Sequence, residues 1–258
     1  MEPGISLELA RERGATLSQV RYDLALDLRD TEHAPGTVTL TFDRAEDAGD
    51  LIVDFRGLYL ESVEANGSPI GEYEWRNGHI LIPRRHLVSG PNRLDFRFTA
   101  AIAPAGASII RFDDPSDGAR YLYTLLVPSD AHQLFPSFDQ PDLKGIFRVE
   151  LTAPEGWQVL ANGPLEERTP VTGGMRWRFA GTEPISTYLA AFAAGPWHSW
   201  ESAPPGERPM ILYARRSRAT EVDADTLIAM NREAVRWLES YFGIPFPFAK
   251  MDLLLAPA

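Results

Sequence analysis

The chain has 258 residues, no cysteine, and a formal net charge of −11 from 25 Lys and Arg against 36 Asp and Glu. The acidic balance disfavours a nucleic-acid partner, because phosphate backbones are negative. The lack of cysteine excludes disulfides, thiol catalysis and cysteine-ligated metals. No apolar run reaches the roughly 18 residues of a membrane span, and the first residues lack a signal-peptide pattern, so we expect a soluble chain of unassigned compartment.

The first 200 residues have the two-residue alternation of apolar and polar side chains that predicts strands with one buried face. The pattern is clearest in residues 20–28, 38–42 and 94–98. Asn66-Gly67 and Asn77-Gly78 are dipeptides that favour tight hairpin turns. Later strands are predicted at residues 121–126, 147–151, 176–179 and 188–192.

The pattern changes after a loop at residues 202–209, which holds three prolines and a glycine. A short strand at 210–214 precedes residues 222–242, where apolar side chains recur at three- and four-residue steps and predict an amphipathic helix. Gly243 and Pro245 should end the helix, and a last strand follows at 251–256. The expected apolar face of the helix comprises Leu227, Met230, Ala234, Trp237, Leu238 and Tyr241.

Few residues suggest chemistry by themselves. None of the five histidines is followed by glutamate, so a His-Glu-x-x-His zinc helix is absent, and surface or packing roles are expected for His79 and His86. Asp113, Asp114 and Asp117 have oxygens suited to calcium but lack the glycine and glutamate of a helix-loop-helix site. A solvated turn is therefore the favoured interpretation.

The segment from Gln133 to Phe147, QLFPSFDQPDLKGIF, holds two prolines among three phenylalanines. Pro136 and Pro141 fix the backbone and remove two hydrogen-bond donors, so the chain must turn here. The phenylalanines should bury a large apolar area beneath the turn. We interpret the segment as an architectural connection packed on a sheet.

Residues 121–163, YLYTLLVPSDAHQLFPSFDQPDLKGIFRVELTAPEGWQVLANG, resemble the N-terminal domain of zinc aminopeptidases of the aminopeptidase N family. The shared residues include Tyr121, Thr124, Asp130 and Ala131, followed by a Phe-Pro-x-x-Asp-x-Pro turn beginning at Phe135. Residues 185–197 are similar to the family's closing strand of that domain, and residues 241–257 to its segment before the exopeptidase motif. The resemblance covers almost the whole chain.

The resemblance implies a mainly β fold: a saddle-like antiparallel β-sandwich at residues 1–200, then at 201–258 the first strand-helix-strand of a thermolysin-like α/β domain. It also implies a parent metallopeptidase that removes N-terminal residues from peptides with zinc. The family's Gly-x-Met-Glu-Asn motif and zinc ligands are not found in this sequence. We therefore expect an inactive portion of the enzyme, with no catalytic or metal residue, that contributes scaffold and part of the pocket wall and contacts the remainder of the catalytic domain.

One departure concerns the pocket. After the position of Thr124 the family commonly has glutamine, which lines the pocket for the first substrate residue, whereas this chain has Leu125 and then Leu126. By resemblance these two residues are the candidate pocket lining, and the wall would be apolar.

An alternative from another class is a free-standing β-sandwich module that binds proteins or glycans. The predicted helix at 222–242 separates the two hypotheses, because a complete module has no need of a trailing strand-helix-strand. If the domain is truncated, part of the apolar helix face should stay exposed.

Overall fold

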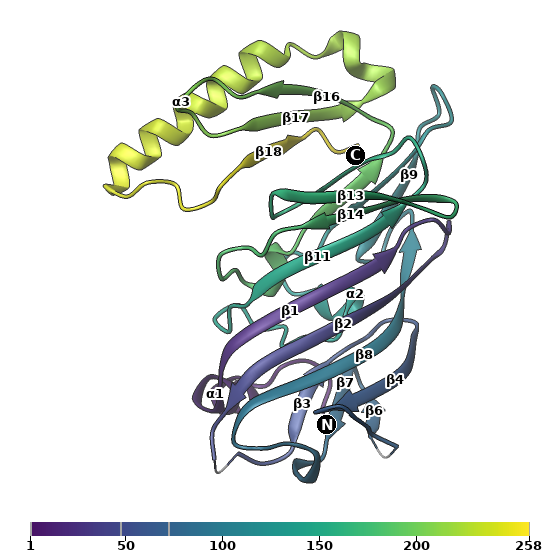
Figure 1. Cartoon of the computed structure of the whole chain (residues 1–258), viewed down its shortest axis with the longest axis vertical. Helices are drawn as coiled ribbons and strands as arrows, with labels where there is room; N and C mark the ends of the chain where they lie inside the picture. Colours follow the sequence, from purple (N-terminus) through teal and green to yellow (C-terminus); the bar gives the residue numbers. More distant parts are fainter. Residues whose placement is uncertain (1, 47, 72, 258) are drawn as a thin grey trace.

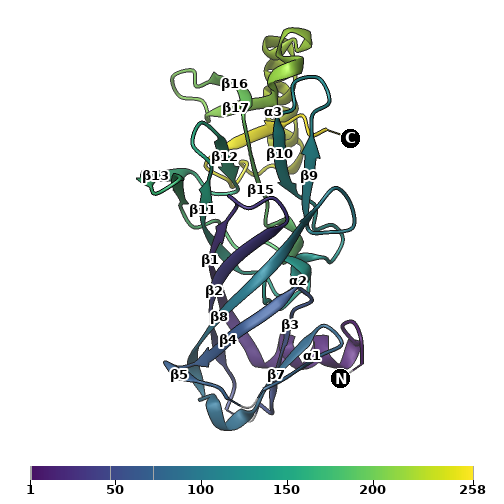
Figure 2. The same cartoon turned by 90° about the vertical axis from the view of Figure 1, so that its right-hand side faces the viewer.

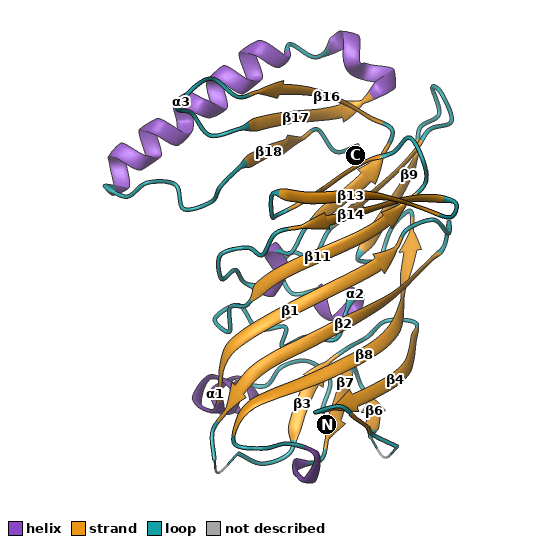
Figure 3. Cartoon of the chain, viewed as in Figure 1, coloured by secondary structure: helices purple, strands orange, loops and turns teal. Residues whose placement is uncertain are grey.

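The computed structural model describes residues 2–46, 48–71 and 73–257, and it is mainly β. It comprises a large 12-stranded sheet, a small three-stranded sheet, and a three-stranded sheet covered by the longest helix, which we call the helix-covered sheet (Figures 1 and 3). The large sheet consists of β1 (Leu17–Asp27), β2 (His33–Arg44), β4 (Tyr59–Ala65), β5 (Ser68–Pro69), β8 (Gly90–Ala103), β9 (Ile109–Asp113), β10 (Arg120–Thr124), β11 (Ile146–Ala153), β12 (Gln158–Ala161), β13 (Leu165–Val171), β14 (Gly174–Phe179) and β15 (Phe192–Gly195). The small sheet consists of β3 (Leu51–Asp54), β6 (Glu74–Arg76) and β7 (His79–Ile82). The helix-covered sheet consists of β16 (Trp197–Ser202), β17 (Met210–Arg215) and β18 (Met251–Leu254). The helical segments are α1 (Leu7–Thr16), α2 (Ala131–Leu134), α3 (Ala224–Phe242) and the 3-10 turns η1 (Arg84–His86), η2 (Thr187–Leu189) and η3 (Arg216–Glu221).

The large sheet runs in the order β12-β15-β10-β9-β8-β2-β1-β11-β14-β13, with β4 also paired to β8 and β5 paired to β4. Most neighbours are antiparallel, as expected, although β1–β11 and β8–β9 are parallel. Val38 on β2 pairs with Leu24 on one side and with Phe96 on the other. The three strands with the clearest alternation therefore lie side by side, and these side chains are buried in one core.

The two predicted hairpin turns are confirmed. Asn66 and Gly67 join β4 to β5, and Asn77 and Gly78 join β6 to β7. All four residues have positive φ angles, between 51° and 81°. Asn and Gly tolerate this conformation, which matches the twist of paired strands.

The segment at residues 133–147 is architectural, as predicted. Phe135, Phe138 and Phe147 are fully buried. The Phe147 ring stacks on Tyr22 with centroids 4.6 Å apart, and the backbone N–H of Phe138 donates to the Tyr22 hydroxyl at 3.0 Å. The turn is therefore fixed on β1 by aromatic packing and by a buried hydrogen bond.

Three local features of the first 200 residues differ from the predictions. The sequence predicted no helix before residue 200, yet α1 begins after Ser6, whose side chain accepts from the N–H of Leu9. The strand predicted at 121–126 ends at Thr124. The strand predicted at 188–192 begins only at Phe192, because the Asn162 side chain bonds the backbone of Leu189 and Ala191 and replaces ladder partners there.

The last part of the chain forms the predicted strand-helix-strand. β17 and β18 pair in parallel and α3 connects them, while β16 adds antiparallel to β17. The Asp223 side chain caps the start of α3, and Gly243 ends it in the left-handed conformation at φ 68°. Both ends agree closely with the prediction.

The packed face of α3 differs from the predicted one. Ala224 and Ile228 are buried against Met210 and Leu212 of β17, and of the predicted face only Leu227 packs there. Met230, Trp237, Leu238 and Tyr241 are exposed. The prediction that part of the apolar face stays exposed is confirmed.

Within the described residues, no helix is long and apolar enough to cross a membrane.

Candidate functional site

A cleft of about 1000 Å³ lies where the large sheet meets the helix-covered sheet. One wall comes from β10, β12 and β15 with the loops beside them, and the other from residues 246–256, which include β18. Figure 2 shows β10, β12 and β15 beneath the helix-covered sheet. Segments more than 100 residues apart in sequence thus share one cavity.

Alternation along β10 determines which side chains pack toward the helix-covered sheet and which toward the large-sheet core. Tyr121 and Tyr123 pack with Tyr213 and Leu254 of the helix-covered sheet, whereas Leu122 is part of the large-sheet core. This is the two-residue period of a strand that separates two layers. Just after the strand, Leu125 lies on the side of Tyr121 and Tyr123, and Leu126 lies on the core side with Leu122.

The structure separates the two predicted pocket-lining residues. Leu125 lines the cleft and is 57% exposed, while Leu126 is 2% exposed in the core and is not part of the lining. Leu189 and Phe248 also line the cleft and are partly exposed. The cleft therefore offers apolar surface from both of its walls.

Charged groups lie on the side of the cleft formed by residues 208 and 246–256. Lys250 and Asp252 form an ion pair, and the Asp252 Oδ1 atom is buried without a hydrogen-bond partner. The Arg208 guanidinium donates to the Phe246 carbonyl at 2.9 Å and lies 4.8 Å from the Phe246 ring centroid. Burial raises the pKa of the neighbouring Tyr213 phenol, and the negative charges of Asp252 and Glu201 raise it further.

The turn at Asp113–Asp117 is exposed as the sequence favoured, except for Asp114, which is buried. Asp114 is 1% exposed and accepts hydrogen bonds from the Ser217 hydroxyl at 2.6 Å and from Arg215 at 3.0 Å. The hydrogen bonds from Ser217, from the Ser116 N–H and from Arg215 lower the pKa of Asp114 to about 2. No local pattern in the sequence signals this burial, because Arg215 and Ser217 lie about 100 residues away from Asp114 along the chain.

A sequence profile of the peptidase M1 N-terminal domain matches residues 18–189. The chain belongs to this family. It is 35% identical to aminopeptidase N of Streptomyces lividans over 99% of this chain and 30% of the relative. It is 30% identical to aminopeptidase N of Acetobacter pasteurianus over 60% of this chain and 43% of the relative. Glutamyl aminopeptidase of Rattus norvegicus is 22% identical over 93% of this chain and 27% of the relative.

The chain therefore spans less than half the length of these relatives. Membership of the M1 peptidase family supports the aminopeptidase hypothesis over the free-standing binding module. The matched M1 N-terminal domain supplies Leu125 and Leu189 to the cleft, while Phe248 and Asp252 lie beyond the matched range. Sequence reasoning missed these far-wall residues, because nothing local in the sequence marks them as neighbours of Leu125.

Among residues 2–46, 48–71 and 73–257, no group of three or more His, Cys, Asp or Glu side chains could hold a metal ion. His79 is buried in an ion-pair cluster with Asp54, in line with the packing role expected for it. The described side chains thus do not fit a zinc site.

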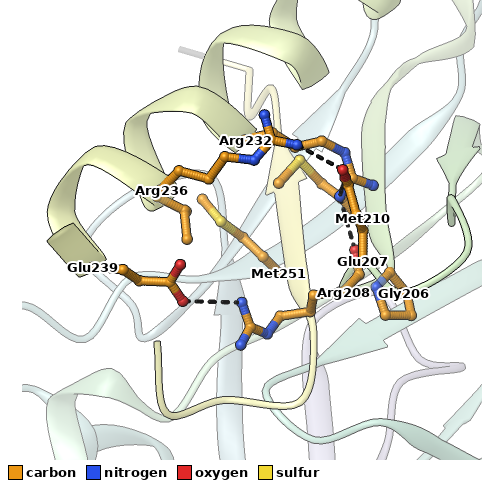
Figure 4. Close-up of a pocket in the computed structure, with 10 residues that line it drawn as sticks. Gly206, Glu207, Arg208, Met210, Arg232, Arg236, Glu239 and Met251 are labelled. Atoms are coloured by element: carbon orange, nitrogen blue, oxygen red, sulfur yellow. Dashed lines mark hydrogen bonds and ion pairs between the residues drawn. The ribbon is translucent and has the colours of Figure 1, made fainter. Parts of the chain in front are cut away.

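A second cavity of about 280 Å³ lies between α3 and the loop before β17 (Figure 4). Glu207 pairs with Arg232 at 2.8 Å and with Arg236 at 2.6 Å, and Arg208 lies 3.9 Å from Glu239. Each of these charges has an opposite partner within the cavity wall. The arrangement holds the loop on the helix, and we assign no ligand to it.

Proposed function

We propose that this chain is the N-terminal, non-catalytic portion of a zinc-dependent aminopeptidase that removes N-terminal residues from peptides. Residues 1–200 would form its β-saddle domain and residues 201–258 the start of its thermolysin-like domain. Family membership and relatives that carry the name aminopeptidase support this assignment. The single observation that carries the proposal is that the M1 domain match includes Leu125, on the wall of the cleft between the large sheet and the helix-covered sheet.

The chemical step would belong to the rest of the whole protein. When bound there, zinc would polarise the first peptide bond and activate water. The described residues do not offer its ligands, so no step is assigned to this chain. Its own contribution would be to form an apolar surface that excludes water beside the first substrate side chain.

Leu125 would shape the choice of that side chain. An isobutyl group offers no hydrogen bond, so a polar substrate side chain would lose its water without compensation. A pocket able to hydrogen-bond discriminates more strongly than an apolar wall. We therefore expect the whole enzyme to prefer apolar first residues.

The test is the Leu125→Gln variant of the full-length enzyme, assayed on a panel of aminoacyl substrates. We expect relative kcat/KM to shift toward polar or basic first residues by about tenfold, which corresponds to one hydrogen bond of about 1.4 kcal/mol. Leu165→Gln is the matched control, because Leu165 is 48% exposed on β13 and does not line the cleft. Identical relative kcat/KM values for Leu125→Gln and the parent would remove Leu125 from the pocket.

A further inference from the structure

The turn between β9 and β10 binds the helix-covered sheet through a buried carboxylate. Asp114 Oδ2 accepts from the Arg215 guanidinium at 3.0 Å and from the Ser217 hydroxyl at 2.6 Å. Asp114 Oδ1 accepts from the Ser116 N–H at 2.9 Å, within the turn itself. The carboxylate is therefore held by its own loop and linked across the joint by two further donors.

A second set of contacts surrounds this pair. Arg216 donates to Asp117 at 2.6 Å, and its backbone N–H donates to the Tyr121 hydroxyl at 3.1 Å. The Arg215 guanidinium also lies 5.0 Å from the centroid of the Phe112 ring. Two consecutive arginines at the end of β17 are thus bound by one turn of the large sheet.

Strand β10 makes a second contact with the last part of the chain, nearer the cleft. The Tyr123 hydroxyl donates to the backbone carbonyl of Pro257 at 3.0 Å. Tyr121 and Tyr123 lie two residues apart on β10 and Leu125 comes just after its end, so the two contacts and the cleft wall follow one line along β10 and just beyond it. A displacement of the helix-covered sheet along this line would change the distance from Leu125 to the opposite wall.

We propose that Asp114 and Arg215 are positioning residues that fix the helix-covered sheet against β10 and so set the width of the cleft. Removing Arg215 leaves a buried carboxylate without its cation, and removing Asp114 leaves Arg215 and Ser217 without their shared acceptor, so we expect the joint to loosen in both cases. The proposal concerns the geometry of the joint. It can be tested without any enzymatic activity, so its outcome is separate from that of the proposed function.

The absence of cysteine allows a direct distance measurement on the 258-residue chain. Spin labels would be attached to Glu166→Cys on β13 and Ser240→Cys on α3, both at exposed positions on opposite sides of the joint. Pulsed electron paramagnetic resonance then gives the distance distribution. We expect one narrow distribution in the parent, and a broader or shifted one when Asp114→Asn or Arg215→Gln is added.

Asp113→Asn is the matched control. Asp113 neighbours Asp114 and undergoes the same change of charge, but it pairs with Arg120 at 2.6 Å and with Arg111 at 3.3 Å, inside its own hairpin. The control should keep the parent distribution. Arg215→Lys keeps the cation and should largely restore the distribution lost in Arg215→Gln.

Parent-like distributions in both Asp114→Asn and Arg215→Gln would overturn the proposal. Thermal unfolding of each variant is measured in parallel, because a broad distance distribution counts only for a variant whose β structure remains folded. Should Asp114→Asn fail to fold, Arg215→Gln and Ser217→Ala decide the matter from the other side of the joint. A broad distribution in Asp113→Asn would also contradict the proposal, since the effect would then not be specific to the Asp114 contact.

Discussion

At the scale of single residues, the Asp54 carboxylate is a densely hydrogen-bonded group of the interior. It accepts two hydrogen bonds from the Arg13 guanidinium, both at 2.7 Å, one from His79 Nδ1 at 2.8 Å and one from the Asp139 N–H at 2.9 Å. Burial alone would raise the pKa of Asp54, but the bonds from His79 and Arg13 outweigh it and hold that pKa below its usual range.

The second ring nitrogen of His79 determines its charge. Nε2 lies 3.0 Å from the carbonyl oxygen of Gly4, which can only accept. Both ring nitrogens of His79 therefore donate, and the side chain is an imidazolium whose pKa the Asp54 bond raises. Asp139, whose N–H donates to Asp54, accepts in turn from the Thr187 hydroxyl at 2.6 Å and from the backbone N–H of His132 at 3.1 Å, and His132 Nδ1 lies 2.7 Å from the same carboxylate.

This protonation state predicts how stability depends on pH. The pKa of His79 is higher in the folded chain than the value of about 6.5 in the unfolded chain. The stabilisation of the folded chain by protonated His79 is thus fully present below about pH 6.5 and is lost as pH rises through the folded-state pKa of His79. His79→Gln should lower the thermal midpoint most at low pH. It should also flatten the dependence of that midpoint on pH above neutrality. Thermal unfolding from acid to alkaline pH tests this, with exposed His198→Gln as the control. An unchanged slope in His79→Gln would contradict the imidazolium assignment.

At the scale of elements, the sequence predicted the strands of alternating pattern and both ends of α3, because alternation, caps and turn dipeptides are local signals. It missed α1, whose single buried side chain is Arg13, so the burial of this helix depends on an ion pair with Asp54 rather than on an apolar stripe. The wrong face was chosen for α3 because that helix has apolar residues on two sides, and only the position of β17 selects Ala224 and Ile228. Leu125 was predicted only by resemblance, and its partners across the cleft come from residues 246–256.

Two helix glycines predict stability changes of opposite sign. Gly14 lies within α1, and a Cβ there would meet no atom within 4 Å. Gly14→Ala should therefore raise the free energy of unfolding by about 0.5–1 kcal/mol, because alanine loses less backbone entropy in a helix. Gly243 has a φ of 68°, so Gly243→Ala should lower it by about 1 kcal/mol. Denaturant unfolding of both variants measures these changes, and equal signs would contradict the cap assignment.

At the scale of the whole molecule, the large sheet and the exposed side of α3 differ in how completely their apolar groups are covered. The phenylalanines of the large sheet are buried, whereas Met230, Trp237, Tyr241, Phe242 and Ile244 are exposed along and just after α3. Trp237 and Tyr241 stack with centroids 5.1 Å apart, and Phe242 meets Tyr241 edge to face at 5.0 Å. Trp237, Tyr241 and Phe242 therefore form one exposed aromatic surface.

An exposed aromatic surface of this kind predicts self-association of the 258-residue chain. Burying one large side chain contributes about 1.5–3 kcal/mol, so covering several of them outweighs part of the entropy lost on association. We expect light scattering to show a concentration-dependent increase in mass that Trp237→Lys reduces, while Thr226→Lys at an exposed position near the start of α3 does not. Hydrogen exchange should slow along α3 as concentration rises, since the helix would become the interface. A chain that stays monomeric at high concentration, with α3 exchanging as slowly as the large sheet, would mean that the surface does not drive association.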